Sequence, residues 1–198
     1  MRAKRTGLAA VVACGLGAPT LGQTAVLSVM HNDPDGLVEP GQSVRIYATI
    51  EYSGAVQIAG VAGSLLATPN VGAAGAPYTP LGGILVNVGM ASGGGIEGYD
   101  VASVPPFFTG GLTLPGWSLS PSLILEYQWT APATPGVVEF DFVASPLAPN
   151  VRLYAQLQSP AFTEAQTTYV GASLTVVPSV GVLWAFGAAG FAGRPKRR

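Results

Sequence analysis

The sequence predicts an all-β protein, a single antiparallel β-sandwich of jelly-roll type. Apolar and polar residues alternate in several short segments, which is the pattern of strands that bury one face. Glycine (27 residues) and proline (17) are frequent enough for many turns, while 48% of the residues are hydrophobic and can form a core. No long segment of the middle shows the 3.6-residue period of an amphipathic helix, which disfavours an α/β fold.

The length of 198 residues fits one β-domain with a tail at each end. We predict a signal peptide at 1–22, a sandwich domain at 23–176 and a C-terminal segment at 177–198. Each end is expected to form a short hydrophobic helix.

The clearest strands are predicted at 43–52, 123–130 and 138–142, where the alternation is strict. Two prolines and a glycine at 131–136 supply turn chemistry and predict a hairpin between the last two strands. Further strands are expected at 25–30, 56–66, 83–90, 151–157 and 169–177. The segments 68–82 and 91–119 carry no strand pattern and are expected to be long loops.

Charge is distributed unevenly along the chain. Seven of the nine basic residues lie near the two ends, so 23–177 holds two basic and ten acidic residues, a net charge of −8. A negative domain repels phosphate groups and anionic membrane surfaces, so nucleic-acid binding is excluded.

The first 22 residues have the order of a secretory signal peptide. Basic residues precede an apolar run at 8–18, Pro19 ends that run, and small residues lead to a cleavage site before Gln23. An alternative is a lipobox at 11–15, in which Cys14 would be lipidated. Because Cys14 is the only cysteine, the mature domain would contain no disulfide.

The C-terminal segment combines a short polar motif, an apolar run at 180–192 and a basic end. The run is shorter than the about 20 residues of a spanning helix, and the basic cluster would stay on the cytoplasmic side. This order resembles the PEP-CTERM sorting signal, although the family's Pro-Glu-Pro is reduced to Val-Pro-Ser. The residues that carry the resemblance are Val177, Pro178, Ser179, Arg194, Lys196, Arg197 and Arg198.

The resemblance to PEP-CTERM implies export machinery and an exosortase-like processing enzyme as partners, with the chain in the cell envelope or outside the cell. The alternative is a plain C-terminal helix that contacts the membrane.

The middle of the chain resembles cohesin-like and related carbohydrate-binding β-sandwiches of extracellular bacterial proteins. The resemblance rests on 37–44 before the first long strand, 58–61 after it, and the turn and aromatic strand at 132–142. It implies a sandwich fold and, more weakly, a binding module.

The sequence contains few residues that could act in catalysis. His31 is the only histidine, no Gly-x-Ser-x-Gly elbow is present, and the mature domain would have no cysteine. We therefore expect no enzyme, no transition-metal site and no cofactor. Glu126, Glu139 and Asp141 on neighbouring predicted strands leave a glycoside hydrolase as a distant alternative, against a solvated sheet face.

Two ligand sites are considered. Asp33 and Asp35, beside Asn32, are oxygen ligands suited to calcium, but the same Asn-Asp-Pro-Asp-Gly sequence also favours a plain turn. Tyr47, Tyr154 and Trp117 are candidates for an aromatic platform that stacks on sugars, or else ordinary packing residues.

The exclusion of nucleic-acid binding, of an enzyme and of a transition-metal site leaves two functional predictions. The main prediction is a non-catalytic, secreted or cell-surface structural protein, associated with the extracellular matrix, that contacts polysaccharide or surface proteins. The alternative is a dedicated carbohydrate- or protein-binding module.

Overall fold

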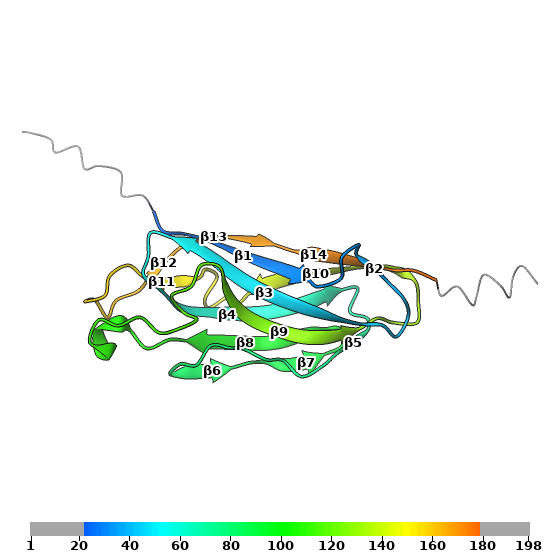
Figure 1. Cartoon of the computed structure of the whole chain (residues 1–198), viewed down its shortest axis with the longest axis horizontal. Coiled ribbons are helices and arrows are strands. Elements are labelled where there is room, and N and C mark those ends of the chain that lie inside the picture. The colour runs from blue at the N-terminus through cyan, green and yellow to red at the C-terminus, as the bar shows by residue number, and fades with distance from the viewer. Residues whose placement is uncertain (1–21, 179–198) are drawn as a thin grey trace, which may run out of the picture.

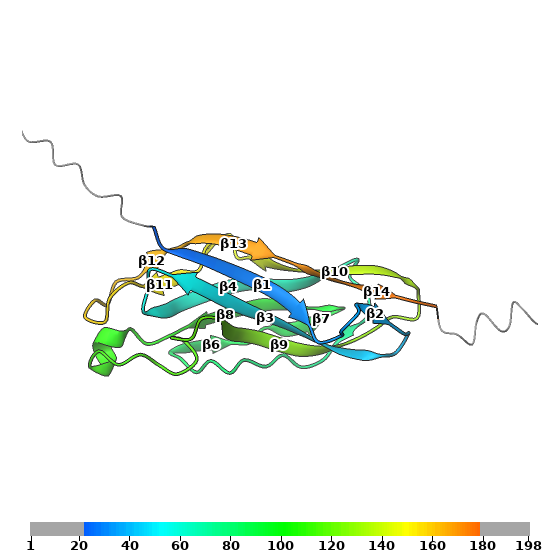
Figure 2. The same cartoon turned by 45° about the horizontal axis from the view of Figure 1, so that its top comes forward.

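Two β-sheets pack face to face in the computed structural model, which describes residues 22–178 (Figure 1). The described chain begins at one end of the sandwich and finishes at the other (Figure 2). The predicted signal peptide, with Cys14, and the predicted sorting segment lie outside the described residues, apart from Gly22, Val177 and Pro178. Within the described range, no helix is long and apolar enough to cross a membrane.

The first sheet, called sheet A, has five strands in the order β13-β1-β3-β9-β5. All neighbours are antiparallel except β1 and β13, which run parallel. The strands are β1 (Thr24–His31), β3 (Ser43–Ser53), β5 (Ala73–Ala74), β9 (Ser122–Thr130) and β13 (Gln166–Val170).

The second sheet, called sheet B, is centred on β4, which pairs with β10 and β11 along one edge and with β8 along the other. The short strands β6 and β7 extend the sheet beyond β8, while β14, β2 and β12 extend it on the other side. The strands are β2 (Leu37–Val38), β4 (Gln57–Thr68), β6 (Leu85–Asn87), β7 (Met90–Ser92), β8 (Gly95–Ala102), β10 (Gly136–Ala144), β11 (Arg152–Tyr154), β12 (Thr163–Glu164) and β14 (Ala172–Val176).

The core lies between the two sheets and is built by the alternation seen in the sequence. In β3 the side chains of Val44, Ile46, Ala48 and Ile50 are all buried, while the residues between them face outward. Burying an aliphatic side chain of this size contributes about 1.5–3 kcal/mol. Trp129 of β9 meets Phe140 of β10 edge to face at 5.2 Å, which joins the sheets.

The predicted strands at 43–52, 123–130 and 138–142 are confirmed, but the predicted hairpin between the last two is wrong. β9 pairs with β3 and β5 in sheet A, whereas β10 pairs with β4 and β14 in sheet B. The Pro-rich loop at 131–135 therefore crosses from one sheet to the other. Two strands that face each other across a core show the same alternation as two hairpin strands, so the pattern does not separate them.

Strands also occur where long loops were expected. The segment 91–119 contains β8, and also the short 3₁₀ helix η1 (Pro106–Thr109), while 68–82 contains β5. The predicted strand at 169–177 is divided at Gly171, where the chain leaves sheet A (β13) and enters sheet B (β14). A Cβ at Gly171 would collide with the Asp141 side chain and lie 2.9 Å from the Phe140 carbonyl oxygen. Glycine therefore permits the change of sheet.

Candidate functional site

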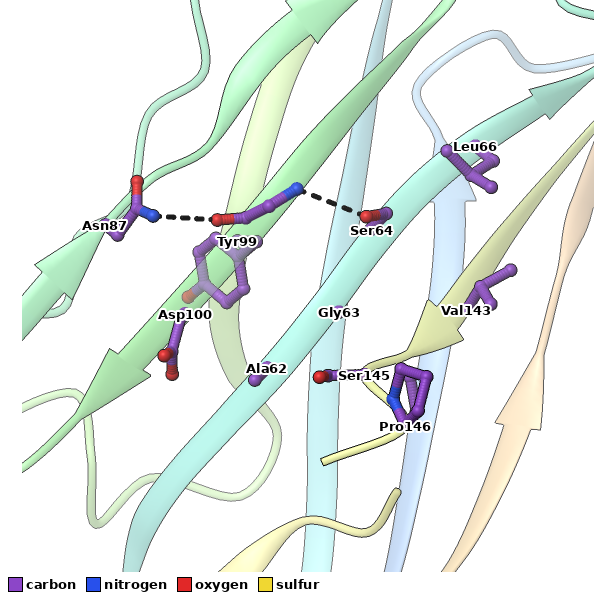
Figure 3. Close-up of a pocket in the computed structure, with 12 residues that line it drawn as sticks. Ala62, Gly63, Ser64, Leu66, Asn87, Tyr99, Asp100, Val143, Ser145 and Pro146 are labelled. Atoms are coloured by element: carbon purple, nitrogen blue, oxygen red, sulfur yellow. Dashed lines mark hydrogen bonds between the residues drawn. The ribbon is translucent and has the colours of Figure 1, made fainter. Parts of the chain in front are cut away.

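A groove of about 420 Å³ runs over the outer face of sheet B, across β8, β4 and the end of β10 (Figure 3). Small side chains on the outer side of β4, chiefly Ala62 and Ser64, form its floor. Asn87 and Asp100 line one side, and Val143 and Pro146 line the other. The groove exists because short side chains lie between strands that carry longer ones.

Hydrogen bonds hold the β8 side of the groove in place. Gly98 has a positive φ of 75° and lies beside an irregularity in the pairing of β4 with β8. Its N–H donates to Ser64 Oγ (3.2 Å), and its carbonyl oxygen accepts from Asn87 Nδ2 (2.9 Å), as Figure 3 shows. These hydrogen bonds to the Gly98 backbone fix the shape of the groove. Binding of a ligand would therefore cost little conformational entropy in the protein.

A pair of opposite charges lies across β4 at one end of the groove. Arg152 Nη2 of β11 is 3.9 Å from Asp100 Oδ1 of β8, above Gly60. A Cβ at Gly60 would lie 3.0 Å from that nitrogen and 2.8 Å from the Val101 carbonyl oxygen, so a larger residue would disturb the pair.

The charged pair keeps unused hydrogen-bonding capacity. Among the described residues, Asp100 Oδ1 and Arg152 Nε are buried and have no hydrogen-bond partner. The Arg152 guanidinium also lies 5.6 Å from the centre of the Phe162 ring. The Asp100 side chain is nevertheless 42% exposed, so its carboxylate can accept a hydrogen bond from a ligand.

The β10 side of the groove is apolar and exposed. Val143 is 51% exposed, and Val137 near the start of the same strand is 55% exposed. Glu139 and Asp141 occupy the positions between them on the same outer face. The face therefore mixes apolar and acidic groups.

The predicted aromatic platform does not form. Trp117 is fully buried, and its Nε1 donates to the Gly82 carbonyl oxygen (2.6 Å). Tyr154 is 4% exposed, whereas Tyr47 lies half-buried on the outer face of sheet A with its ring 5.0 Å from the Arg45 guanidinium. Gly116, with φ of 83°, turns the loop so that Trp117 points into the core, which a loop position in the sequence does not reveal.

The candidate calcium ligands take part in a turn. Asp33 Oδ1 accepts from the Gly36 N–H (2.8 Å), and Asp35 Oδ1 accepts from the Leu37 N–H (3.0 Å). The bond from Leu37 holds the pKa of Asp35 below its usual value. Within 22–178, no three His, Cys, Asp or Glu residues come together as a metal site.

The three carboxylates considered for glycoside hydrolysis are not on neighbouring strands, so that expectation is wrong. Glu126 belongs to β9 in sheet A, where it is ion-paired with Arg45, whereas Glu139 and Asp141 belong to β10 in sheet B. A hydrolytic pair needs two carboxyl groups across one cleft, about 5–10 Å apart. Glu126 therefore cannot form such a pair with Glu139 or Asp141, because the core separates the outer faces of the two sheets.

Sequence reasoning missed Asp100, Asn87 and Arg152. One signal was available, because Arg152 is one of only two basic residues in 23–177 and must lie within an acidic surface. Asp100 gave no signal, because the glycines around it hid strand β8.

Several solved structures share the fold of this chain. No family model and no curated protein matches the chain. The structure is similar to the seventh ScaB type I cohesin from Pseudobacteroides cellulosolvens, with a TM-score of 0.54 and 12% identity over 80% of this chain and 94% of that one.

Two further similar structures come from complexes. One is a chain of the CaDoc0917–CaCohA2 complex, with a TM-score of 0.50 and 13% identity over 78% of this chain and all of that one; CaCohA2 is from Clostridium acetobutylicum. The other is a chain of the type I cohesin–dockerin complex Coh-OlpA–Doc918 from Clostridium thermocellum, with a TM-score of 0.50 and 7% identity over 79% and 99% of the chains. The chain therefore has a cohesin-like β-sandwich fold.

Proposed function

We propose that this chain is a non-catalytic protein-binding module that docks a partner protein on the outer face of β8, β4 and β10. The observation that carries the proposal is the groove of about 420 Å³, with a floor of small residues, an apolar side at Val143 and the Asp100 carboxylate at its end. The alternative of a binding module thus replaces the purely structural role as the main interpretation.

The groove suits a protein partner in shape and chemistry. Apolar side chains of the partner would pack on the exposed Val143, and desolvating such contacts provides most of the free energy of protein association. The partner would also place a donor, such as a lysine or arginine side chain, on the Asp100 carboxylate, whose side chain is 42% exposed. A net charge of −8 over 23–177 would attract such a basic surface from a distance.

The similar structures support a protein as the partner. One of them comes from a cohesin–dockerin complex and another from the CaDoc0917–CaCohA2 complex, so chains with this sandwich fold take part in protein association. For this chain, the acidic and apolar groups of the groove favour a partner protein with a basic, partly apolar surface.

The setting of this module is part of the proposal. We propose that the chain is exported and held at the cell envelope, with a processing enzyme of the exosortase type acting on 177–198. The supporting observation is the sequence order at both ends, described above. In that setting the module would bind a surface or matrix protein.

Photo-crosslinking tests the docking proposal. A photoreactive phenylalanine derivative replaces Val143 in the full-length chain, and in a matched control it replaces Val26, which is 37% exposed on the outer face of sheet A. After illumination in the native cells, we expect one discrete protein adduct from position 143 and none of the same mass from position 26. No adduct from position 143, or the same adduct from both, would contradict the proposal.

A further inference from the structure

A second, smaller hollow of about 120 Å³ lies on the opposite side of the sandwich, on the outer face of sheet A. Its lining consists of Arg45 from β3, of Glu126, Tyr127 and Gln128 from β9, and of Ala76 and Tyr78 from the loop after β5. Nothing in the docking face on sheet B uses these residues.

Tyr78 is held rigidly by its backbone while its ring stays open to solvent. Its N–H donates to the Glu126 carbonyl oxygen (2.8 Å), and the Glu126 N–H donates back to the Tyr78 carbonyl oxygen (2.9 Å). The Gly75 N–H donates in addition to the Gln128 carbonyl oxygen (2.7 Å). The loop is thus fastened along β9, yet the Tyr78 side chain remains 57% exposed. A fixed, exposed ring is a surface on which a ligand can stack.

The base of the hollow is the ion pair of Arg45 and Glu126. The centre of the Tyr47 ring lies 5.0 Å from the Arg45 guanidinium, and this contact helps to orient the arginine. Among the described residues, Arg45 Nε is buried and has no partner. The Arg45 and Glu126 side chains are 39% and 24% exposed, so the guanidinium and the carboxylate can both contact a ligand in the hollow.

The combination points to one class of ligand. We propose that this hollow binds one sugar residue of a neutral polysaccharide, with its apolar ring face on Tyr78 and its hydroxyl groups on Arg45, Glu126 and Gln128. Hydroxyl groups both donate and accept, so they match a site that presents a guanidinium, a carboxylate and an amide together. The paired charges cancel locally, and the acidic domain repels uronic acids and other anionic sugars.

Affinity electrophoresis of the full-length chain tests this site. Native gels contain a neutral polysaccharide (hydroxyethylcellulose, galactomannan or xyloglucan) or the anionic alginate, and retardation gives an association constant. We expect retardation by at least one neutral polymer and none by alginate. Tyr78→Ala and Gln128→Ala should each weaken that binding about fivefold or more, because a stacked ring or a lost hydrogen bond is worth about 1 kcal/mol. Both side chains are exposed, and circular dichroism checks that the variants fold.

The groove variant Val143→Arg is the matched control, because it alters only the docking face on sheet B. We expect it to bind the neutral polymer as the unmodified chain does. Absence of retardation by every neutral polymer, retardation by alginate alone, or full binding by Tyr78→Ala would overturn the sugar site. None of these outcomes bears on the protein-docking proposal, which has its own readout at position 143.

Discussion

The core leaves no room for a side chain at position 63. A Cβ on Gly63 would lie 2.5 Å from Phe142 Cε1 and 2.5 Å from the Val143 carbonyl oxygen, and the backbone oxygen has no freedom to move away. We predict that Gly63→Ala lowers the free energy of unfolding by about 1–3 kcal/mol, the usual cost of overpacking. Chemical denaturation of the full-length chain measures this change.

The control for this prediction is Gly82→Ala. Nothing lies within 4 Å of a Cβ at Gly82, so its effect should stay within about 0.5 kcal/mol. Equal stabilities of Gly63→Ala and Gly82→Ala would contradict the close contact of Gly63 in β4 with Phe142 and Val143 in β10.

Single residues were predictable from the sequence where they belong to an alternating strand. Val44, Ile46 and Ile50 are buried as their spacing indicates. Trp117 and Tyr154 were not predictable, because their burial depends on how a loop and a short strand fold back onto the core. Tyr78 shows the reverse case, in which a loop residue becomes a fixed, exposed ring through pairing with a strand 48 positions later in the chain.

At the level of elements, strand positions were more predictable than strand partners. β1, β3, β4, β9 and β10 lie where the apolar alternation placed them. β8 was missed because Gly95 and Gly98 interrupt its pattern, although Ile96, Tyr99 and Val101 are its buried side. The partner of β10 was mistaken because pairing depends on contacts between distant segments, and alternation within a strand contains no information about them.

The candidate groove is likewise a product of pairing. Ala62 and Ser64 of β4 come beside Asp100 of β8 and Val143 of β10 only when the central sheet is assembled. Nothing in any one of these segments marks a binding site. The fold class could therefore be predicted from the sequence, while the position of the groove required the structure.

The Tyr99 side chain, from β8 of sheet B, also connects sheet B to sheet A. Its hydroxyl donates to the Ile124 carbonyl oxygen of β9 in the opposite sheet (2.7 Å). Burial raises the pKa of the Tyr99 hydroxyl well above its ordinary value. The hydroxyl therefore stays protonated and keeps donating at any physiological pH.

At the scale of the whole molecule, the two proposed binding surfaces lie on opposite faces of the sandwich, one on each sheet. A partner protein on sheet B and a sugar residue on sheet A can therefore be bound at the same time, because the core separates them. Such a module would link a surface or matrix protein to a neutral polysaccharide.

The proposed export and processing concern the entire chain. We predict that protein recovered from the native envelope and medium starts at Gln23 and has lost the residues after about Val177. Intact mass spectrometry measures both ends at once. A lipidated Cys14 or a retained Arg198 would contradict the proposed processing by a sorting enzyme, and would indicate a lipoprotein or a tail-anchored protein instead.

Docking of a protein on the groove of sheet B is tested by measuring the affinity of two matched variants for the crosslinked partner. Val143→Arg places a long charged side chain at the groove, and Val26→Arg makes the same change on the outer face of sheet A. We predict that Val143→Arg weakens binding at least tenfold, about 1.4 kcal/mol, while Val26→Arg leaves the affinity within twofold. Equal affinities of the two variants, or a loss confined to Val26→Arg, would show that the partner does not dock on this groove.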